Sequence, residues 1–97
     1  MARAIWHETI LADSDKCVIV EGNYYFPPDS VNFGYLQPSE TLTESGWKGT
    51  AHYYDVVLQG TRNTDAAWSY PEPKDATRRI SGHVAFWKGV EIHGLDD

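Results

Sequence analysis

Turn signals recur at short intervals, and they constrain the fold more than any other feature of the sequence. The residue pairs that carry them are Asp13-Ser14, Gly22-Asn23, Gln59-Gly60 and Lys88-Gly89. Glycine, asparagine, aspartate and serine favour turns because they adopt or stabilise the backbone conformations that turns require. The segments between these pairs are short and rich in strand-forming residues. The sequence therefore predicts a mainly β fold built from short antiparallel strands.

Only one stretch carries signals for both the start and the end of a helix. Prolines and acidic residues stand at its beginning, two arginines lie near its end, and Gly82 follows. We therefore expect one short helix of about two turns over Pro73–Ser81. A helix this short is unstable alone in water, so Ala76 and Ile80 are expected to dock it on the sheet.

Two hairpins are expected at the ends of the chain. The first joins residues 4–6 to residues 9–12 through the polar pair His7-Glu8, with a single bent strand as the alternative. The last joins residues 84–87 to residues 90–93 through the turn at Lys88-Gly89.

The segment 47–58 predicts a long central strand with two different faces. Side chains alternate between the faces of a strand, which places Lys48, His52 and Tyr54 on the same side. The Gln59-Gly60 turn then returns the chain into an antiparallel partner strand.

The length and the aromatic content bound the core. A chain of 97 residues has the length of one domain, so we expect residues 1–97 to form a single domain. A domain this small has room for little core, and its four Trp, six Tyr and three Phe are expected to supply most of it.

Charge and cysteine content exclude several classes of protein. The formal net charge is −6 and no basic cluster is longer than Arg78-Arg79, which argues against a nucleic-acid partner. The sequence has neither an apolar run long enough for a signal peptide nor one long enough for a membrane span, so a cytoplasmic location without membrane partners is expected. Cys17 is the only cysteine, which excludes an internal disulfide and a zinc site built on cysteine pairs.

Aromatic and charged residues of the central strands predict a ligand pocket. Trp68 and Tyr70 share a face of the strand that follows the Gln59-Gly60 turn, and Glu21 ends an otherwise apolar segment. If these faces meet, the result is a cleft with aromatic walls, one cation and one carboxylate, which suits a small flat or polar ligand. With Trp87 added, the rings of Trp47, Trp68 and Tyr70 are candidates for an aromatic cage, which would favour a flat or cationic ligand through stacking and cation–π contact. The candidate ligand-binding residues are Glu21, Tyr25, Trp47, Lys48, His52, Tyr54, Trp68 and Tyr70.

No complete catalytic set is recognisable. Asp13-Ser14-Asp15 has the spacing of a carboxylate pair for metal-dependent nucleotidyl transfer, but no glycine-rich phosphate loop accompanies it. The histidines are not spaced as metal ligands, so we expect neither a metal nor a cofactor. Lys48 is the most interesting candidate, because burial at a strand start would lower its pKa towards a range useful for catalysis. Its structural alternative is an ion pair with Glu21 or another acidic residue that closes the edge of the sheet.

Four motifs, in order along the chain, resemble one family. They are the segments 24–27 (YYFP), 47–50 (WKGT), 66–73 (AAWSYPEP) and 82–87 (GHVAFW). Together they resemble the domain of unknown function family 427, sometimes labelled a nucleotidyltransferase. The resemblance implies a compact β-tent fold, similar to Mss4-like proteins, without the zinc that many of those carry. It implies no established activity.

Three classes of function stay open on the sequence alone. They are a module that binds a small molecule, an enzyme that uses Lys48, His52, Tyr54 or Glu21 as acid or base, and a protein-interaction domain that exposes its aromatic residues. The aromatic lining with few polar groups favours the first. The sequence leaves the oligomeric state open.

Overall fold

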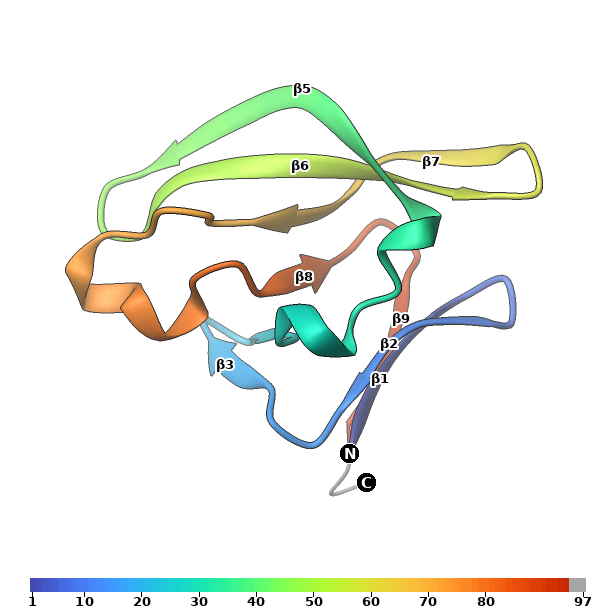
Figure 1. Ribbon diagram of the computed structural model, residues 1–97, viewed down its shortest axis with the longest axis horizontal. Coiled ribbons are helices and arrows are strands. Elements are labelled where there is room, and N and C mark those ends of the chain that lie inside the picture. Colours follow the sequence, from blue (N-terminus) through green and yellow to red (C-terminus); the bar gives the residue numbers. More distant parts are fainter. Residues whose placement is uncertain (95–97) are drawn as a thin grey trace.

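The computed structural model describes residues 1–94 and is mainly β, as the turn signals predict (Figure 1). Its strands are β1 (Ala2–Trp6), β2 (Thr9–Ser14), β3 (Val18–Val20), β4 (Asn23–Tyr25), β5 (Leu36–Ser45), β6 (Gly49–Leu58), β7 (Thr61–Ser69), β8 (Val84–Phe86) and β9 (Glu91–His93). In this described part of the chain, three short 3₁₀ helices interrupt the strands, namely η1 (Pro28–Ser30), η2 (Phe33–Tyr35) and η3 (Asp75–Ile80).

The strands form three antiparallel sheets. The largest has the order β5-β6-β7-β8, the second has the order β2-β1-β9, and β3 pairs with β4 as a separate hairpin. The four-stranded sheet lies across the upper part of Figure 1, and the three-stranded sheet stands below it. An antiparallel bridge from Phe26 to Val84 ties the β3-β4 hairpin to β8.

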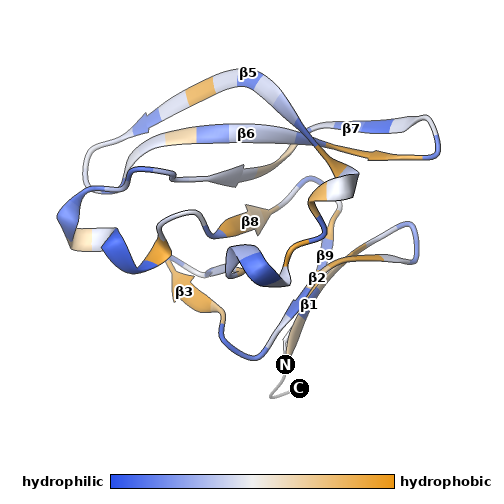
Figure 2. Ribbon diagram, in the orientation of Figure 1, coloured by the Kyte–Doolittle hydropathy of each residue, from blue (hydrophilic) through white to orange (hydrophobic). Residues whose placement is uncertain are grey.

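Within residues 1–94, two apolar clusters make up the core, and β8 lies between them. Val84 and Phe86 belong to the larger cluster, whereas Ala85 belongs to the smaller one. Successive side chains of a strand point to opposite faces, so a strand between two clusters must be apolar throughout. Figure 2 shows this difference in hydropathy, since β8 is hydrophobic along its length and the edge strand β5 is mostly hydrophilic.

The predicted helix lies in the predicted place but is not an α-helix. The segment 75–80 forms the 3₁₀ helix η3, which is kinked at Thr77. Thr77 is fully buried, and its hydroxyl binds the carbonyl oxygen of Lys74. The predicted docking residue Ile80 is buried in the smaller cluster, whereas Ala76 is exposed. A segment that meets the core at only a few side chains gains little from completing α-helical turns.

The last predicted hairpin is wrong, because β8 and β9 belong to different sheets. The turn at Lys88-Gly89 forms as expected, with both residues at positive φ. However, β8 pairs with β7, and β9 pairs with β1. The turn therefore carries the chain from the four-stranded sheet to the three-stranded sheet.

Two other turn predictions need correction, while the first hairpin and the Gln59-Gly60 turn are confirmed. Asp13-Ser14 is strand rather than turn, because Asp13 pairs in register with Arg3 of β1 and forms an ion pair with it at 3.3 Å. The turn predicted at Gly22-Asn23 lies one residue earlier, at Glu21-Gly22, where φ is 54° and 81°. Glu21 is thus at a hairpin tip and does not end a strand.

A bulge of three residues against one interrupts the pairing of β6 with β7. Asp55 of β6 alone faces residues 64–66 of β7, and Asp65 adopts a positive φ of 56°. The buried carboxylate of Asp55 holds the bulge, since it accepts the backbone N–H of Asp65 at 2.9 Å. Asp55 also pairs with Arg62 at 2.6 Å. Bulges bend a strand and redirect its side chains.

The β-tent fold that the family resemblance implies is a more specific assignment than mainly β, and it stays a prediction. No helix within residues 1–94 is both long and apolar enough to cross a membrane.

Candidate functional site

An aromatic cavity of about 250 Å³ opens beside the four-stranded sheet. We call it the aromatic pocket. It is lined by Asn23, Lys48, Tyr53, Trp68, Tyr70 and Trp87. These residues come from β4, β6, β7 and the turns next to β6, β7 and β8. The site therefore depends on segments that are far apart in the sequence.

Trp68 is the central ring of the aromatic pocket. Its ring centroid lies 6.3 Å from that of Tyr53, 5.6 Å from that of Trp87 and 6.2 Å from that of Tyr25. Its indole N–H donates to the hydroxyl of the fully buried Tyr25 at 3.2 Å. Ring pairs at these separations add stabilisation beyond the area that they bury. Trp68 is therefore held in one orientation on its buried side while it lines the pocket on the other.

Trp87 forms the outer wall of the aromatic pocket, and the bulge in β7 positions it. Its indole N–H donates to the carbonyl oxygen of Asp65 at 2.6 Å, and its backbone N–H donates to that of Ala66 at 3.0 Å. The residue is 45% exposed. Asp65 thus connects the buried carboxylate of Asp55 to the wall of the pocket.

Lys48 is fixed by its backbone as well as by its side chain. It lies in the turn between β5 and β6, where its N–H donates to Ser45 Oγ at 3.2 Å. Its carbonyl oxygen accepts the N–H of Lys74 at 3.1 Å. The ammonium group lies 5.7 Å from the ring centroid of Tyr70 and 5.9 Å from that of Trp47, within the range of cation–π contacts.

Lys48 forms an ion pair with Glu21, as the structural alternative for this lysine predicted. Burial acts to lower the pKa of Lys48. The hydrogen bond that Lys48 donates to Glu21 and the neighbouring phenol groups of Tyr25 and Tyr70 outweigh burial, so the pKa is raised. The predicted lowering of the Lys48 pKa is therefore wrong, because the sequence pattern does not show which side chains surround the ammonium group in the fold. A lysine held in its protonated form donates hydrogen bonds and does not act as a general base.

Gly49 explains the third position of the Trp-Lys-Gly motif. Its φ is 109°, and a Cβ atom there would lie 3.3 Å from the carbonyl oxygen of Glu72 and 3.5 Å from Cα of Pro73. A residue with a side chain would therefore be strained and would push the segment 72–74 away from Lys48.

We expect Gly49→Ala to destabilise the fold by about 1–3 kcal/mol, because of the positive φ and the tight contact with the backbone. Urea unfolding followed by circular dichroism measures this loss. Gly46→Ala is the matched control, since a Cβ atom at Gly46 would meet nothing within 4 Å and φ there is not positive. Equal losses for both variants would contradict this explanation of the motif.

The structure brings most of the candidate residues together. Lys48, Trp68 and Tyr70 line the aromatic pocket, Tyr25 lies beneath Trp68, and Glu21 binds Lys48. The indole N–H of Trp47 donates to Glu21 at 3.3 Å, so Trp47 lies at the rim.

His52 and Tyr54 lie elsewhere. His52 is exposed, and Tyr54 packs against Phe33 and the larger cluster. The alternation along β6 does not extend back to Lys48, because Gly49 with its positive φ separates the turn from the strand. Lys48 therefore lines the aromatic pocket together with Tyr53, and not with His52 and Tyr54, which the alternation placed on its side.

Two lining residues were not among the sequence candidates, namely Asn23 and Tyr53. Tyr53 alternates with Ala51, and both pack on the smaller cluster. The sequence signal for Tyr53 was this alternation with Ala51. The signal points to a site only when Lys48 is known to lie on the same side of the sheet as Tyr53. Asn23 had no such signal, because the register of a two-stranded hairpin decides its position.

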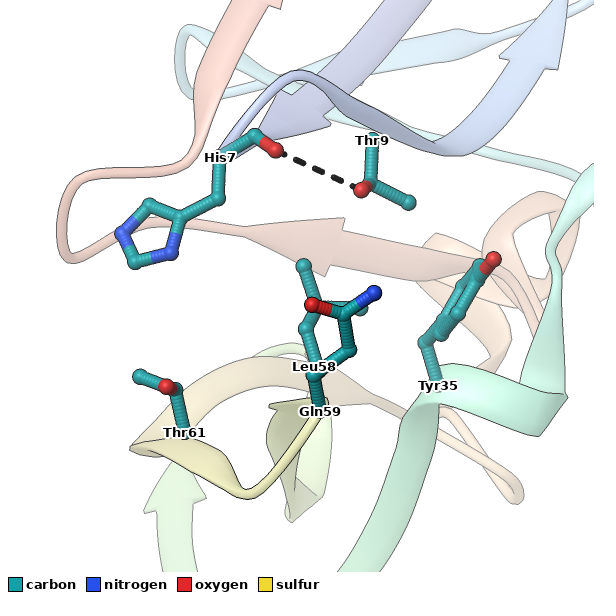
Figure 3. Close-up of a pocket in the computed structure, with 6 residues that line it drawn as sticks. All are labelled: His7, Thr9, Tyr35, Leu58, Gln59 and Thr61. Atoms are coloured by element: carbon teal, nitrogen blue, oxygen red, sulfur yellow. Dashed lines mark hydrogen bonds between the residues drawn. The ribbon is translucent and has the colours of Figure 1, made fainter.

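A second cavity, of about 240 Å³, lies between the tips of two hairpins and the helix η2 (Figure 3). Its lining residues are His7, Thr9, Tyr35, Leu58, Gln59 and Thr61. Figure 3 shows His7 and Tyr35 on opposite sides, with Gln59 between them. The hydroxyl of Thr9 binds the carbonyl oxygen of His7 at 3.4 Å. This cavity has no ion pair and no buried cation among its lining residues, so we favour the aromatic pocket as the functional site.

The carboxylates that a metal-dependent nucleotidyl transfer requires do not gather in the described part of the chain. Asp13 is paired with Arg3, and within residues 1–94 no group of three or more His, Cys, Asp or Glu residues is placed to hold a metal ion.

Comparison with known proteins agrees with the motifs. A family model labelled NTP_transf_9 and described as a domain of unknown function (DUF427) matches residues 1–95. A search of curated proteins found no match. Because the family model covers nearly the whole sequence, the chain belongs to the DUF427 family.

Proposed function

We propose that the protein binds a small, flat molecule that carries a polar group. One observation carries the proposal: a cavity of about 250 Å³ has walls of aromatic rings and a single ammonium group, that of Lys48, among its lining residues. Ligand sites in general combine apolar and aromatic walls with a few fixed polar groups. The hydrogen bonds and ring contacts that hold Trp68 and Lys48 would keep the pocket preformed.

The size of the pocket favours a ligand with one ring. A cavity of about 150 Å³ is enough to hold benzene, whereas sites for drug-sized ligands measure about 300–1,000 Å³. At about 250 Å³ the aromatic pocket suits one ring with a polar substituent. A nucleoside triphosphate is much larger, so the pocket gives no support to the nucleotidyltransferase label of the family.

A protein-interaction domain is the second candidate. Trp47 and Trp87 are 42% and 45% exposed, and exposed aromatic residues are enriched at interfaces. Association that depends on protein concentration, without any small ligand, would support this candidate. An enzyme is the third, and the raised pKa of Lys48 favours a role as a fixed hydrogen-bond donor and positive charge over one as general base.

We expect single-ring probes to bind the aromatic pocket. Benzamide, benzoate and benzamidine have nearly the same shape and differ in charge, so they separate stacking from charge recognition. The indole N–H signals of the four tryptophans report the location of binding by NMR. We expect at least one probe to bind with a Kd of about 1 mM or below and to shift the signals of Trp68 and Trp87.

Trp6 provides an internal control, because its ring stacks on His7 at 3.9 Å beside the second cavity. Its signal should stay in place. Tyr53→Leu should weaken binding, whereas Tyr35→Leu at the second cavity should leave it unchanged. Saturable shifts of Trp6 alone, or the absence of saturable binding by all three probes, would contradict the proposed function.

A further inference from the structure

The two partners of the ion pair at the aromatic pocket differ in their exposure. The side chain of Lys48 is 11% exposed, whereas that of Glu21 is 50% exposed. A buried charge needs a partner, because an unpaired charge away from water is costly. A half-exposed carboxylate can be hydrated instead, and its ion pair contributes little to stability. Lys48 therefore depends on an anion, but Glu21 does not depend on Lys48.

The position of Glu21 allows its carboxylate to leave Lys48. It lies at the tip of the hairpin between β3 and β4, at a φ of 54° and next to Gly22. The described hydrogen bonds of its carboxylate come from two side chains, those of Lys48 and Trp47. A rotation of the Glu21 side chain would break both contacts without moving a strand. The pKa of Glu21 is lowered, chiefly by the hydrogen bond from Lys48, so the carboxylate is charged at neutral pH and competes with other anions.

The charge at the pocket also selects among ligands. The ammonium group of Lys48 already occupies the cation–π position over Tyr70. A cationic ligand would lie beside the like charge of Lys48, and the ring of Tyr70 would not be free to make a cation–π contact with it. A ligand with a carboxylate finds a buried cation, and the amide of Asn23 on the neighbouring wall is a further donor group.

We propose that Glu21 occupies the place of a ligand carboxylate, and that the aromatic pocket takes a single-ring aromatic carboxylate that displaces Glu21 from Lys48. This inference rests on the proposed function, because it names the class of ligand for the same pocket. The ring would lie against Trp68, Tyr53 and Trp87, while the carboxylate would accept a hydrogen bond from Lys48. Glu21 is then an internal competitor that sets the affinity for anions.

The test compares benzoate, benzamide and benzamidine on the wild type and on Glu21→Gln. Glutamine keeps the size of the side chain and removes its charge, so it competes less well for Lys48. We expect Glu21→Gln to bind benzoate about 10-fold more tightly. The reason is that the binding-competent state, in which Lys48 is free of Glu21, becomes more populated. Benzamide affinity should change less than about twofold, because benzamide is neutral and does not compete as an anion with Glu21 for Lys48. Benzamidine should bind both proteins more weakly than benzamide does.

Two further variants keep the test decisive. Trp47→Phe removes the N–H that donates to Glu21, so it should strengthen benzoate binding in the same direction but by less. Glu91→Gln removes the same charge from β9, in the other sheet, and should leave all three affinities unchanged. Melting temperatures check that each variant is folded, and Trp47→Phe provides the answer if Glu21→Gln does not fold.

The outcomes separate this inference from the proposed function. If benzamide binds and neither Glu21→Gln nor Trp47→Phe tightens benzoate, the role of Glu21 is wrong and the binding function stands. If benzamidine binds the wild type best and Glu21→Gln loses it, Glu21 recognises a cationic ligand and the inference is overturned. If no probe binds any variant, the proposed function fails with it.

Discussion

Trp68→Ala is expected to reduce the free energy of unfolding by about 3–5 kcal/mol, the usual cost of truncating a buried tryptophan. Trp68 is only 9% exposed and packs against several rings of the smaller cluster. The variant would also leave the buried hydroxyl of Tyr25 without the indole donor. For a chain of this size, each kcal/mol corresponds to about 4–8 °C in melting temperature. Urea unfolding and calorimetry would both measure the change.

Trp47→Ala is the matched control for this large effect. Trp47 is 42% exposed, and its indole N–H contacts the half-exposed Glu21. Surface substitutions of this kind cost about 1 kcal/mol or less. If the two variants lose equal stability, Trp68 is not the central ring of a packed pocket.

Lys48→Met is expected to weaken the binding of benzoate by about 10- to 100-fold, which is the range for losing a hydrogen bond to a charged group. Its melting temperature should stay within a few degrees of the wild type. Methionine fills the space of the lysine stem, and Glu21 is exposed enough to be hydrated when its partner is removed. Titration by NMR and thermal unfolding measure the two effects on the same samples.

Lys74→Met separates the loss of this particular ammonium group from a general loss of charge. Lys74 is exposed, and its ammonium group binds the carbonyl oxygen of Gly46, near Lys48 but outside the pocket lining. Its variant should bind benzoate within about twofold of the wild type, because screened surface charges contribute little. A strongly destabilised Lys48→Met would instead make the ion pair a part of the core.

Much of the fold could be predicted from local signals. The pair Gln59-Gly60 specifies a tight turn because glycine adopts positive φ at no steric cost, and the strands on either side of it pair as expected. The same reasoning failed at Lys88-Gly89, where the turn forms but the strands separate. A turn signal specifies a local change of direction, and it does not specify which sheet the next strand joins.

The candidate site shows the same division. Composition and alternation were enough to select Trp68 and Tyr70 as rings on one face, since the period of a strand is fixed by its backbone. They also suggested that Glu21 and Lys48 would pair. They could not place Lys48 beside Tyr53, because the positive φ of Gly49 interrupts the alternation just where the strand begins.

The sequence by itself determined that this chain is mainly β, that it turns at Gln59-Gly60 and Lys88-Gly89, that one short helical segment precedes Gly82, and which aromatic residues are available for a site. These properties depend on backbone conformations within a few residues of each other. Only the tertiary structure decided that β8 and β9 join different sheets, that the bulge at Asp65 anchors Trp87, and that Lys48 is buried while Glu21 is half-exposed. Those features arise from contacts between residues that are distant in the sequence, and their energies depend on packing and solvent exposure that no local pattern contains.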